Sequence, residues 1–383
     1  MINAQTHRRC GALALALAVS AALFAGCGDS SSSSSSTERS RASTGAATAD
    51  LRALFEGEGY AAPAADGPAP KPGRRVYVIS CGENQSTCNV ASAAAVAAAK
   101  SIGWTTTLVD SRSDPTEMTN GIRRAIAARA DGVIAYGIDC PVVKQALSEA
   151  RAAGLRTAAA ESSQCTEGGY DTVVTYAQGD FPRWFAAFGA AQAKALIANT
   201  GGDAKTIVLH ETDVPDLEFA YRGFLGEYAT CDGCEIVATV DFASGDFGSK
   251  LEQKVQQALV QHPDANAVYL PYDAVLDVGA MAALRASGRL PKLTLALAEG
   301  QSSTMAALRD GTFRGAGVGV PQVWEAYHSV DDLVRSFAGA PQVSSGIGIQ
   351  AYDADHNLSD SGPWQPPIDF RAAYAKRWGA GAP

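Results

Sequence analysis

Short apolar stretches alternate with amphipathic helical patterns along most of this chain, and this alternation constrains the possible fold most strongly. Strands are expected at 76–80, 105–110, 132–136, 156–160 and 172–176, with helices at 90–102, 116–129 and 142–153 between them. In the helix at 116–129 the apolar residues recur at the spacing of one helical face. Short buried strands separated by such helices predict β-α-β units with parallel strands.

The alternation starts again after a long apolar helix expected over residues 181–199. The later strands are expected at 207–210, 235–240, 267–270, 293–298 and 315–320, and the later helices at 217–229, 247–261, 276–287 and 303–309. Two separate runs of β-α-β units predict an α/β protein with two doubly wound parallel-sheet lobes.

Composition restricts the classes of function. The chain has 383 residues, 46% of them hydrophobic, which is enough for two or three domains with sizeable cores. It carries 31 Lys+Arg against 40 Asp+Glu, a formal net charge of −9. A general nucleic-acid binder needs a basic face, so this balance argues against nucleic acid as a partner.

The first 27 residues have the pattern of an export signal. A basic start at 7–9 precedes an apolar stretch at 10–24 and the small residues before Cys27. The apolar stretch is shorter than the about 20 residues of a membrane span. The sequence L-F-A-G-C at its end resembles the bacterial lipobox, which implies cleavage before Cys27 and attachment of lipid to this cysteine. The alternative is an uncleaved anchor in which Cys27 is incidental.

Residues 28–73 are rich in Ser, Ala and Pro and include seven consecutive serines at 30–36. Such a composition buries too little apolar surface to offset the entropy of ordering the chain. We therefore expect a flexible tether here. With a lipid on Cys27, the folded part would lie outside the cytoplasmic membrane, on its outer face, which is the periplasm in a Gram-negative cell.

The cysteines agree with export. Of eight cysteines, Cys10 lies in the signal and Cys27 would carry the lipid, which leaves six. An even number in an exported domain suggests disulfides, although six cysteines allow fifteen pairings. We predict the sequential pairs Cys81–Cys88, Cys140–Cys165 and Cys231–Cys234. Zinc binding at the last pair is disfavoured because the five histidines are scattered singly, and no metal or cofactor is expected.

Ligands of parallel α/β sheets bind beyond the carboxyl ends of the strands. In this sequence those positions are the loops at 81–89, 110–116, 137–141, 161–166, 211–216, 241–246, 271–273 and 299–302. Nearly every loop carries a carboxylate, an amide or an aromatic ring. Two lobes that face each other across these loops would form a polar cleft.

Several motifs carry a resemblance to a known family. The stretch D-S-R-S-D-P-T-E-M-T-N-G-I-R-R-A-I-A-A-R-A-D-G-V-I-A-Y-G-I-D at 110–139 resembles the extracytoplasmic sugar-binding proteins of ABC importers, in particular the ribose-binding type. Further landmarks are A-R-A-A-G-L-R-T at 150–157, Y-R-G-F at 221–224, V-Y-L-P-Y-D-A-V at 268–275 and L-A-E-G at 297–300. Together they span about residues 74–350.

The resemblance implies a type I periplasmic binding protein that closes around a small molecule. Its lobes would be joined by three crossovers, near 176–180, 318–321 and 346–352. The N-terminal lobe would comprise 74–178 and 321–348, and the C-terminal lobe 179–320 and 349–383.

At the positions of the family's ligand contacts, this chain retains the acids but lacks several of the arginine and amide side chains. Glu161 retains the acid of an aspartate–arginine pair, whereas Ser162 replaces its arginine. The position of a second arginine of the family is occupied here by Ala220 or Glu218, so this arginine is also lost. Gly319 stands in place of a glutamine of the family. These losses argue against ribose, whose hydroxyls need that set of donors and acceptors. The ligand-binding candidates are Glu83, Asn84, Asp139, Glu161, Phe242, Tyr272, Asp273 and Glu299.

These candidates favour a sugar or polyol, and an amine-bearing ligand is also compatible through charge pairing and cation–π contact. Glu161 and Asp273, expected on opposite lobes, should contribute to affinity and hardly to fold stability.

Purely structural roles are open for several of the same residues. Asp114, Asp139 and Asp216 could cap the helices that follow them. Phe242 and Tyr272 could pack at the interface of the lobes, and Trp104 is expected in the core. Trp184 and Trp324 each follow a crossover, where they could line the cleft or pack the hinge.

The leading functional prediction is a monomeric, lipid-anchored substrate-binding protein that delivers a small polar molecule to the permease of an ABC importer. The alternative is a receptor of the same fold that serves a sensor kinase or chemoreceptor. An enzyme is disfavoured because the sequence has no G-x-S-x-G, H-E-x-x-H or P-loop motif, although paired carboxylates could cleave a glycoside.

Overall fold

The computed structural model describes residues 51–379. The predicted signal, Cys10, Cys27 and the tether up to residue 50 lie outside the described residues. Within 51–379 no helix has both the length and the apolar character needed to cross a membrane.

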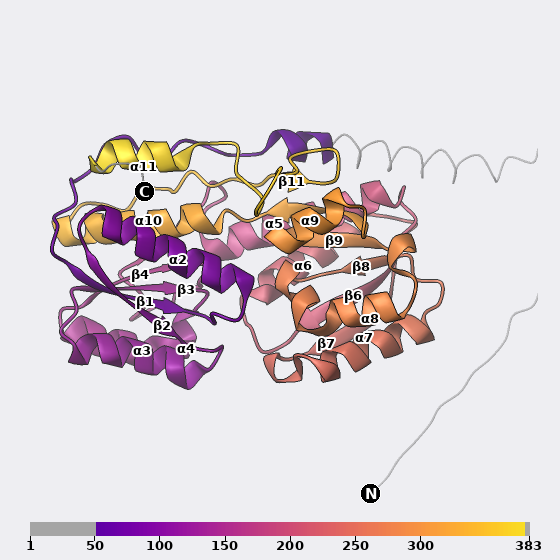
Figure 1. The fold of residues 1–383 in the computed structure, drawn as a ribbon, viewed down its shortest axis with the longest axis horizontal. Coiled ribbons are helices and arrows are strands. Elements are labelled where there is room, and N and C mark those ends of the chain that lie inside the picture. Colours follow the sequence, from indigo (N-terminus) through magenta and orange to yellow (C-terminus); the bar gives the residue numbers. More distant parts are fainter. Residues whose placement is uncertain (1–50, 380–383) are drawn as a thin grey trace, which may run out of the picture. The chain divides into compact units, whose positions relative to one another are not determined.

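The N-terminal lobe contains a five-stranded sheet of entirely parallel strands in the order β2-β1-β3-β4-β5 (Figure 1). Its elements are β1 (Arg75–Ser80), α2 (Ser86–Ser101), β2 (Thr105–Asp110), α3 (Pro115–Ala127), β3 (Gly132–Tyr136), α4 (Cys140–Ala152), β4 (Arg156–Ala160), β5 (Thr172–Val173) and the later helix α10 (Gln322–Ala338). Successive residues of a strand point to opposite faces. Val78 accordingly packs in the cluster under α2 and α10, whereas Ile79 packs in the cluster under α3 and α4.

The C-terminal lobe contains a six-stranded sheet in the order β11-β10-β9-β8-β6-β7, in which only β11 is antiparallel. Its elements are α5 (Phe181–Asn199), β6 (Lys205–Glu211), α6 (Leu217–Tyr228), β7 (Glu235–Phe242), α7 (Ser249–Gln261), β8 (Ala267–Tyr269), α8 (Met281–Ala286), β9 (Thr294–Glu299), α9 (Ser302–Arg309), β10 (Arg314–Gly319) and β11 (Ala351–Tyr352). Helices α5 and α6 pack closely because Gly189 and Gly223 have no side chain; a Cβ at either would overlap the backbone of the facing helix.

These two sheets confirm the predicted α/β fold with two parallel-sheet lobes. The boundaries differ locally. The strand expected at 172–176 is reduced to two residues, and the helix expected at 276–287 is interrupted. Gly279 has a φ of +140°, which an L residue rarely adopts, and only the part from Met281 continues as a regular helix.

The chain passes between the lobes at the three predicted places, between β5 and α5, between β10 and α10, and just before β11. Trp184 packs this hinge: its ring stacks on Tyr176 at 4.4 Å, and its Nε1 donates to the carbonyl of Gly348 at 3.0 Å. Trp324 is also fully buried and stacks on Phe370 at 5.3 Å. Both tryptophans therefore pack the crossovers and do not line the cleft. Trp104 lies in the core, as expected.

All three predicted disulfides are present: Cys81–Cys88, Cys140–Cys165 and Cys231–Cys234. The first joins the loop after β1 to α2, the second joins the start of α4 to the loop after β4, and the third joins the end of α6 to β7. Two of these bridges therefore brace loops at the carboxyl ends of strands.

The segment at 51–73 corrects the expected extent of the tether, because it packs on the lobes. Leu51 and Leu54 are buried in the main core cluster. Glu58 pairs with Ile349 through two backbone hydrogen bonds, at the third crossover. Trp104 Nε1 donates to the carbonyl of Lys71 at 2.8 Å. Most of the apolar residues in this segment are alanines, but its two leucines are placed where the lobes can bury them.

The last helix, α11 (Phe370–Trp378), also differs from its predicted place. Residues 349–383 were expected in the C-terminal lobe, and β11 does join that sheet. Helix α11 instead packs on α10 of the N-terminal lobe, as Figure 1 shows. Trp378 Nε1 donates to Asp331 at 3.0 Å, and Tyr374 OH lies 2.8 Å from His328 Nδ1. The C-terminal segment thus spans both lobes.

We predict that a chain beginning at residue 74 is about 3–6 kcal/mol less stable than a chain beginning at residue 51, because burial of Leu51 and Leu54 is lost. Urea unfolding of the two purified chains measures the difference. Equal midpoints would show that residues 51–73 contribute nothing to the fold.

Candidate functional site

A cleft of about 310 Å³ lies between the lobes, and the loops that follow the strands line it. The N-terminal lobe contributes Cys81, Gln85, Thr87, Cys88, Ser113, Pro115, Met118, Gly137, Asp139, Val142 and Glu161. The C-terminal lobe contributes Phe181, Phe185, Glu211, Asp213, Val214, Pro215, Asp216, Leu217, Ser244, Pro271, Tyr272, Glu299 and Val320. The expected position at the carboxyl ends of the strands is therefore confirmed for the cavity.

Four of the eight predicted ligand contacts line this cleft: Asp139, Glu161, Tyr272 and Glu299. The other four do not. Glu83 accepts hydrogen bonds from Asn89 and Ser92 of α2 at 2.8 and 2.7 Å. Asn84, the next residue of the same loop, is exposed. Phe242 is buried in the core of the C-terminal lobe, 6.4 Å from the ring of Phe247, so it has a packing role, but within this lobe and not at the interface of the lobes.

Asp273 holds a loop in place. Its carboxylate accepts backbone N–H bonds from Ala298, Gly300 and Gln301, each at 2.9 Å. These bonds fix the turn after β9, where Glu299 and Gly300 both have a positive φ. Burial raises the pKa of Asp273 to about 6, although the three N–H donors favour the charged form. These bonds favour a structural role for Asp273 in the loop around Glu299, in contrast to the expectation that it contributes to affinity and hardly to fold stability.

The sequence prediction missed three acids of the loop after β6, Glu211, Asp213 and Asp216. Asp216 had a capping role as its alternative, but its side chain makes no capping bond to α6. Asp139 makes no capping bond either and accepts from Ser163 N and Oγ at 2.8 and 2.9 Å. Asp114 does cap α3, through the N–H of Thr116. The signal available in the sequence was E-T-D-V-P-D, three acids in six residues without a base.

The acids of the cleft lie close to one another. Asp216 of the C-terminal lobe lies near Asp139 and Ser163 of the N-terminal lobe: besides burial, Asp139 raises the pKa of Asp216, whereas the donors of Ser163 lower it. Glu161 contacts Glu325 of α10, which accepts hydrogen bonds from Tyr136 OH and Tyr176 OH at 2.9 Å each. Two pairs of acids therefore lie near each other, Glu161 with Glu325 and Asp139 with Asp216, and the second pair lies across the two lobes.

Burial and neighbouring charge make these acids weak. Burial raises the pKa of Glu211 to about 7, despite hydrogen bonds from Tyr272 OH at 2.6 Å and Ser244 Oγ at 3.0 Å. Burial, and then the charge of Asp273, raise the pKa of Glu299 to about 8. For Glu161 and Asp216, burial is again the main cause of a strongly raised pKa, and the adjacent carboxyls add to it.

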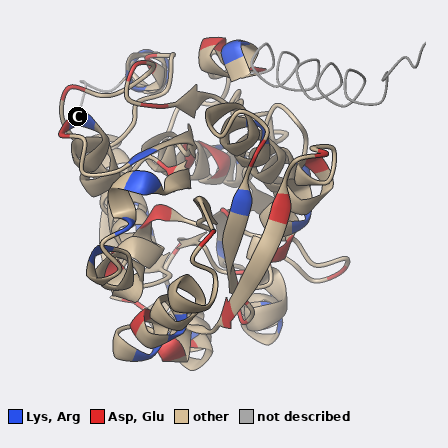
Figure 2. Ribbon diagram, turned by 90° about the vertical axis from the view of Figure 1, so that its right-hand side faces the viewer, with Lys and Arg blue, Asp and Glu red and all other residues tan. Residues whose placement is uncertain are grey.

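The lining of the cleft contains six carboxylates and no Lys, Arg or His. In the view of Figure 2, basic and acidic residues alternate along the helices and strands of the ribbon. Among residues 51–379, no three His, Cys, Asp or Glu side chains are grouped as a metal site. The cleft thus offers hydrogen-bond acceptors and negative charge.

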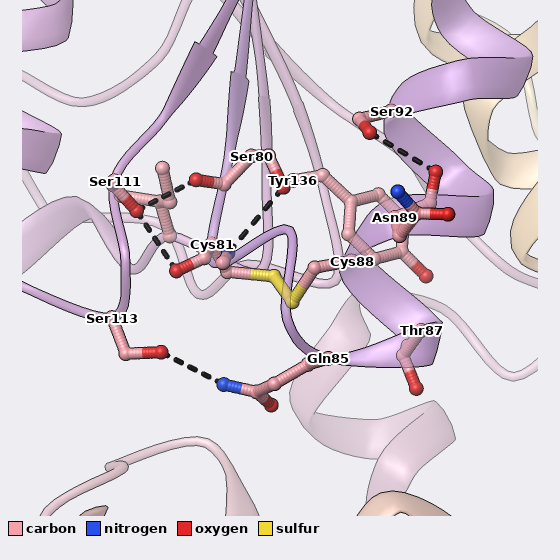
Figure 3. Close-up of a disulfide and its surroundings, with 12 residues drawn as sticks. Ser80, Cys81, Gln85, Thr87, Cys88, Asn89, Ser92, Ser111, Ser113 and Tyr136 are labelled. Atoms are coloured by element: carbon pink, nitrogen blue, oxygen red, sulfur yellow. Dashed lines mark hydrogen bonds between the residues drawn. A yellow bond between two sulfur atoms is a disulfide. The ribbon is translucent and has the colours of Figure 1, made fainter.

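The lobes also touch directly beside the cavity. Thr87 Oγ1 of α2 donates to Glu299 Oε2 at 2.9 Å, and Gln301 Nε2 donates to Thr87 Oγ1 at 2.9 Å. Figure 3 shows Thr87 next to the Cys81–Cys88 bridge, and Gln85 Nε2 donating to Ser113 Oγ at 2.8 Å. The disulfide therefore holds the segment that reaches the opposite lobe.

Two parallel-sheet lobes, three crossovers and a polar cleft between the sheets define a type I periplasmic binding protein. The sequence matches the Periplasmic binding protein domain over residues 76–340, and the chain belongs to this family. No curated protein sequence matches the chain.

Solved structures share the fold at low sequence identity. A sugar ABC transporter from Yersinia enterocolitica subsp. enterocolitica 8081 is 17% identical with a TM-score of 0.67, covering 82% of this chain and 98% of that one. An ABC transporter periplasmic solute binding protein from Actinobacillus succinogenes 130z, with bound D-allose, is 14% identical with a TM-score of 0.64, covering 74% and 98%. The XylFII–LytSN complex is similar at 16% identity and a TM-score of 0.60, covering 75% and 99%.

The different roles of Asp273 and Glu161 predict opposite effects on stability at neutral pH. Asp273→Asn should lower the free energy of unfolding by about 2–4 kcal/mol, because backbone N–H groups lose a charged acceptor. Glu161→Gln should leave it unchanged or raise it, because a carboxyl beside Glu325 is removed. Urea unfolding of both variants tests this, and a Glu161→Gln protein as unstable as Asp273→Asn would contradict the assignment.

The raised pKa values predict that stability without ligand falls as pH rises. Glu211 and Glu299 bind a proton more tightly in the folded chain than in the unfolded chain, where Glu has a pKa near 4.3. The free energy of unfolding should therefore fall between about pH 5 and pH 8, by on the order of 7 kcal/mol from these two acids. Unfolding midpoints across this range measure the slope. The Glu299→Gln variant should show a smaller fall, and a profile that rises with pH would refute the prediction.

Proposed function

We propose that this protein is the substrate-binding lipoprotein of an ABC importer and captures a small polar molecule, with a sugar or polyol favoured. The observation that carries the proposal is the cleft between the lobes, which is lined by carboxylates from both of them. The protein binds its ligand without transforming it, in keeping with its family.

The chemistry of the lining supports a ligand rich in hydroxyl groups. Carboxylate oxygens accept hydrogen bonds from hydroxyls, and charged acceptors form the stronger bonds. Phe181 and Phe185 supply apolar surface on the same cleft, and their rings lie 4.9 Å apart. A sugar ring has polar edges and an apolar face, so it could use both kinds of surface. Structures of the same fold include one with bound D-allose, which supports a carbohydrate.

The proposed location follows from the start of the sequence. Cleavage before Cys27 and lipid attachment would hold the protein on the outer face of the cell membrane, as a monomer beside its permease. The tether would then comprise residues 28–50, because residues 51–73 pack on the lobes.

A ligand-sensing receptor is the second candidate. The fold is also that of the protein in the XylFII–LytSN complex, so a partner other than a permease is compatible with these lobes. Binding of the ligand would be the same in both cases, and only the docking partner would differ.

Uptake by living cells tests the importer. A strain that lacks this protein should lose accumulation of one radiolabelled sugar or polyol from a panel that includes D-allose, arabinose and glycerol. The wild-type chain should restore it, and the Cys27→Ala chain should be released from the membrane fraction. Unchanged uptake of every compound, together with loss of a transcriptional response to one of them, would favour the receptor.

A further inference from the structure

The acids of the cleft have no basic counterpart, although the protein pairs charges elsewhere. Six carboxylates line the cavity: Asp139, Glu161, Glu211, Asp213, Asp216 and Glu299. Most of the donors among the lining side chains are already engaged, although the hydroxyl of Ser113 is seen only as an acceptor. Gln85 donates to Ser113, Thr87 donates to Glu299, and Ser244 and Tyr272 donate to Glu211. A ligand therefore has to supply donors and would meet almost only acceptors.

Asp216 gives a second and independent indication. Its side chain is only 6% exposed, and its Oδ1 has no hydrogen-bond partner within the described chain. It lies on the cleft near Asp139 and Ser163 of the other lobe. Ser163 donates to Asp139 Oδ1 and also favours the charged form of Asp216, which leaves Asp216 Oδ1 as the oxygen without a partner. A buried oxygen without a partner is costly, so this position favours a donor from outside the chain.

A neutral hydroxyl could fill the hydrogen bond but would leave the charges unbalanced. Two carboxylates brought together at a closing interface repel each other strongly in a medium of low dielectric constant. A bound cation removes this repulsion. A metal ion is disfavoured because the acids are not grouped as a metal site within residues 51–379. An ammonium group provides three donors and one positive charge in a compact form.

We propose that the ligand is a hydroxyl-bearing amine, such as an amino sugar or an amino polyol, whose ammonium group lies between Asp139 and Asp216. The inference rests on the proposed function and narrows its ligand class. The hydroxyls are bound by the remaining acids, and the ammonium group joins the two lobes. Closure is then coupled to recognition, because one of these carboxyls comes from each lobe.

Matched ligand pairs test this in the full-length protein. Calorimetry at about pH 7 compares glucosamine, galactosamine and glucamine with glucose, galactose and glucitol. At least one amine should bind about thirtyfold more tightly than its neutral parent, because a buried charge pair is lost in the parent. Its affinity should also fall as potassium chloride is added.

Two variants locate the charge. Asp216→Asn and Asp139→Asn should each weaken binding of the amine about thirtyfold, and each should weaken binding of the neutral parent by a smaller factor, because the parent loses a hydrogen bond but no charge pair. Asp216→Asn should raise the unfolding midpoint, because it removes one of two neighbouring like charges. Asp139→Asn should lower the midpoint without unfolding the protein, because Ser163 N and Oγ lose a charged acceptor. Asp355→Asn, an exposed acid outside the cleft lining, is the matched control and should leave the affinity unchanged.

The remaining outcomes overturn the inference. If the neutral parents bind as tightly as the amines, the ligand is a plain sugar or polyol, and the proposed function stands. If calcium or magnesium binds instead, the acids form a cation site. If no amine binds, the inference fails, and the uptake experiment decides separately whether the proposed function fails with it.

Discussion

Every strand of the two described sheets except β11 is parallel to its neighbours, so the loops that follow the strands gather at one edge of each sheet. This constraint places side chains that are far apart in the sequence on one cavity. Asp139 follows β3 and Asp216 follows β6, yet they lie near each other. The helices and the hydrophobic clusters serve to hold these loop ends fixed relative to one another.

Negative charge is concentrated where the lobes meet. Contact between the lobes buries polar groups that water would otherwise solvate. These groups are Asp139 and Asp216 at one place and Thr87 and Glu299 at another. The hydroxyl of Thr87 satisfies one of these acids, whereas Asp216 Oδ1 is left without a partner among residues 51–379. Desolvation therefore opposes closure of the cleft unless protons or a ligand compensate it. The same groups would thus determine both the ligand and the conformation.

Hydrophobic periodicity was sufficient for the fold, because each strand and helix shows its pattern locally. The three disulfides were predicted by pairing the six cysteines in sequential order, one choice among fifteen possible pairings. The site was harder to predict. Asp139, Glu161, Tyr272 and Glu299 lie in the cleft, but Phe242 points to the core side of β7, and Asp273 turns back to bind the loop after β9. The direction of a loop side chain depends on contacts with distant residues, such as Ala298 for Asp273, and these leave no local pattern.

Residues 51–73 have a mechanical consequence for any attachment that precedes them. Glu58 and Ala61 hydrogen-bond to Ile349 and Gly346, within the third crossover, so the chain enters the folded body at its hinge. A force transmitted along the preceding segment would act on the pivot and exert little leverage on either lobe. If the preceding segment were attached to a membrane, the lobes could therefore open and close around the hinge without displacing the attachment point.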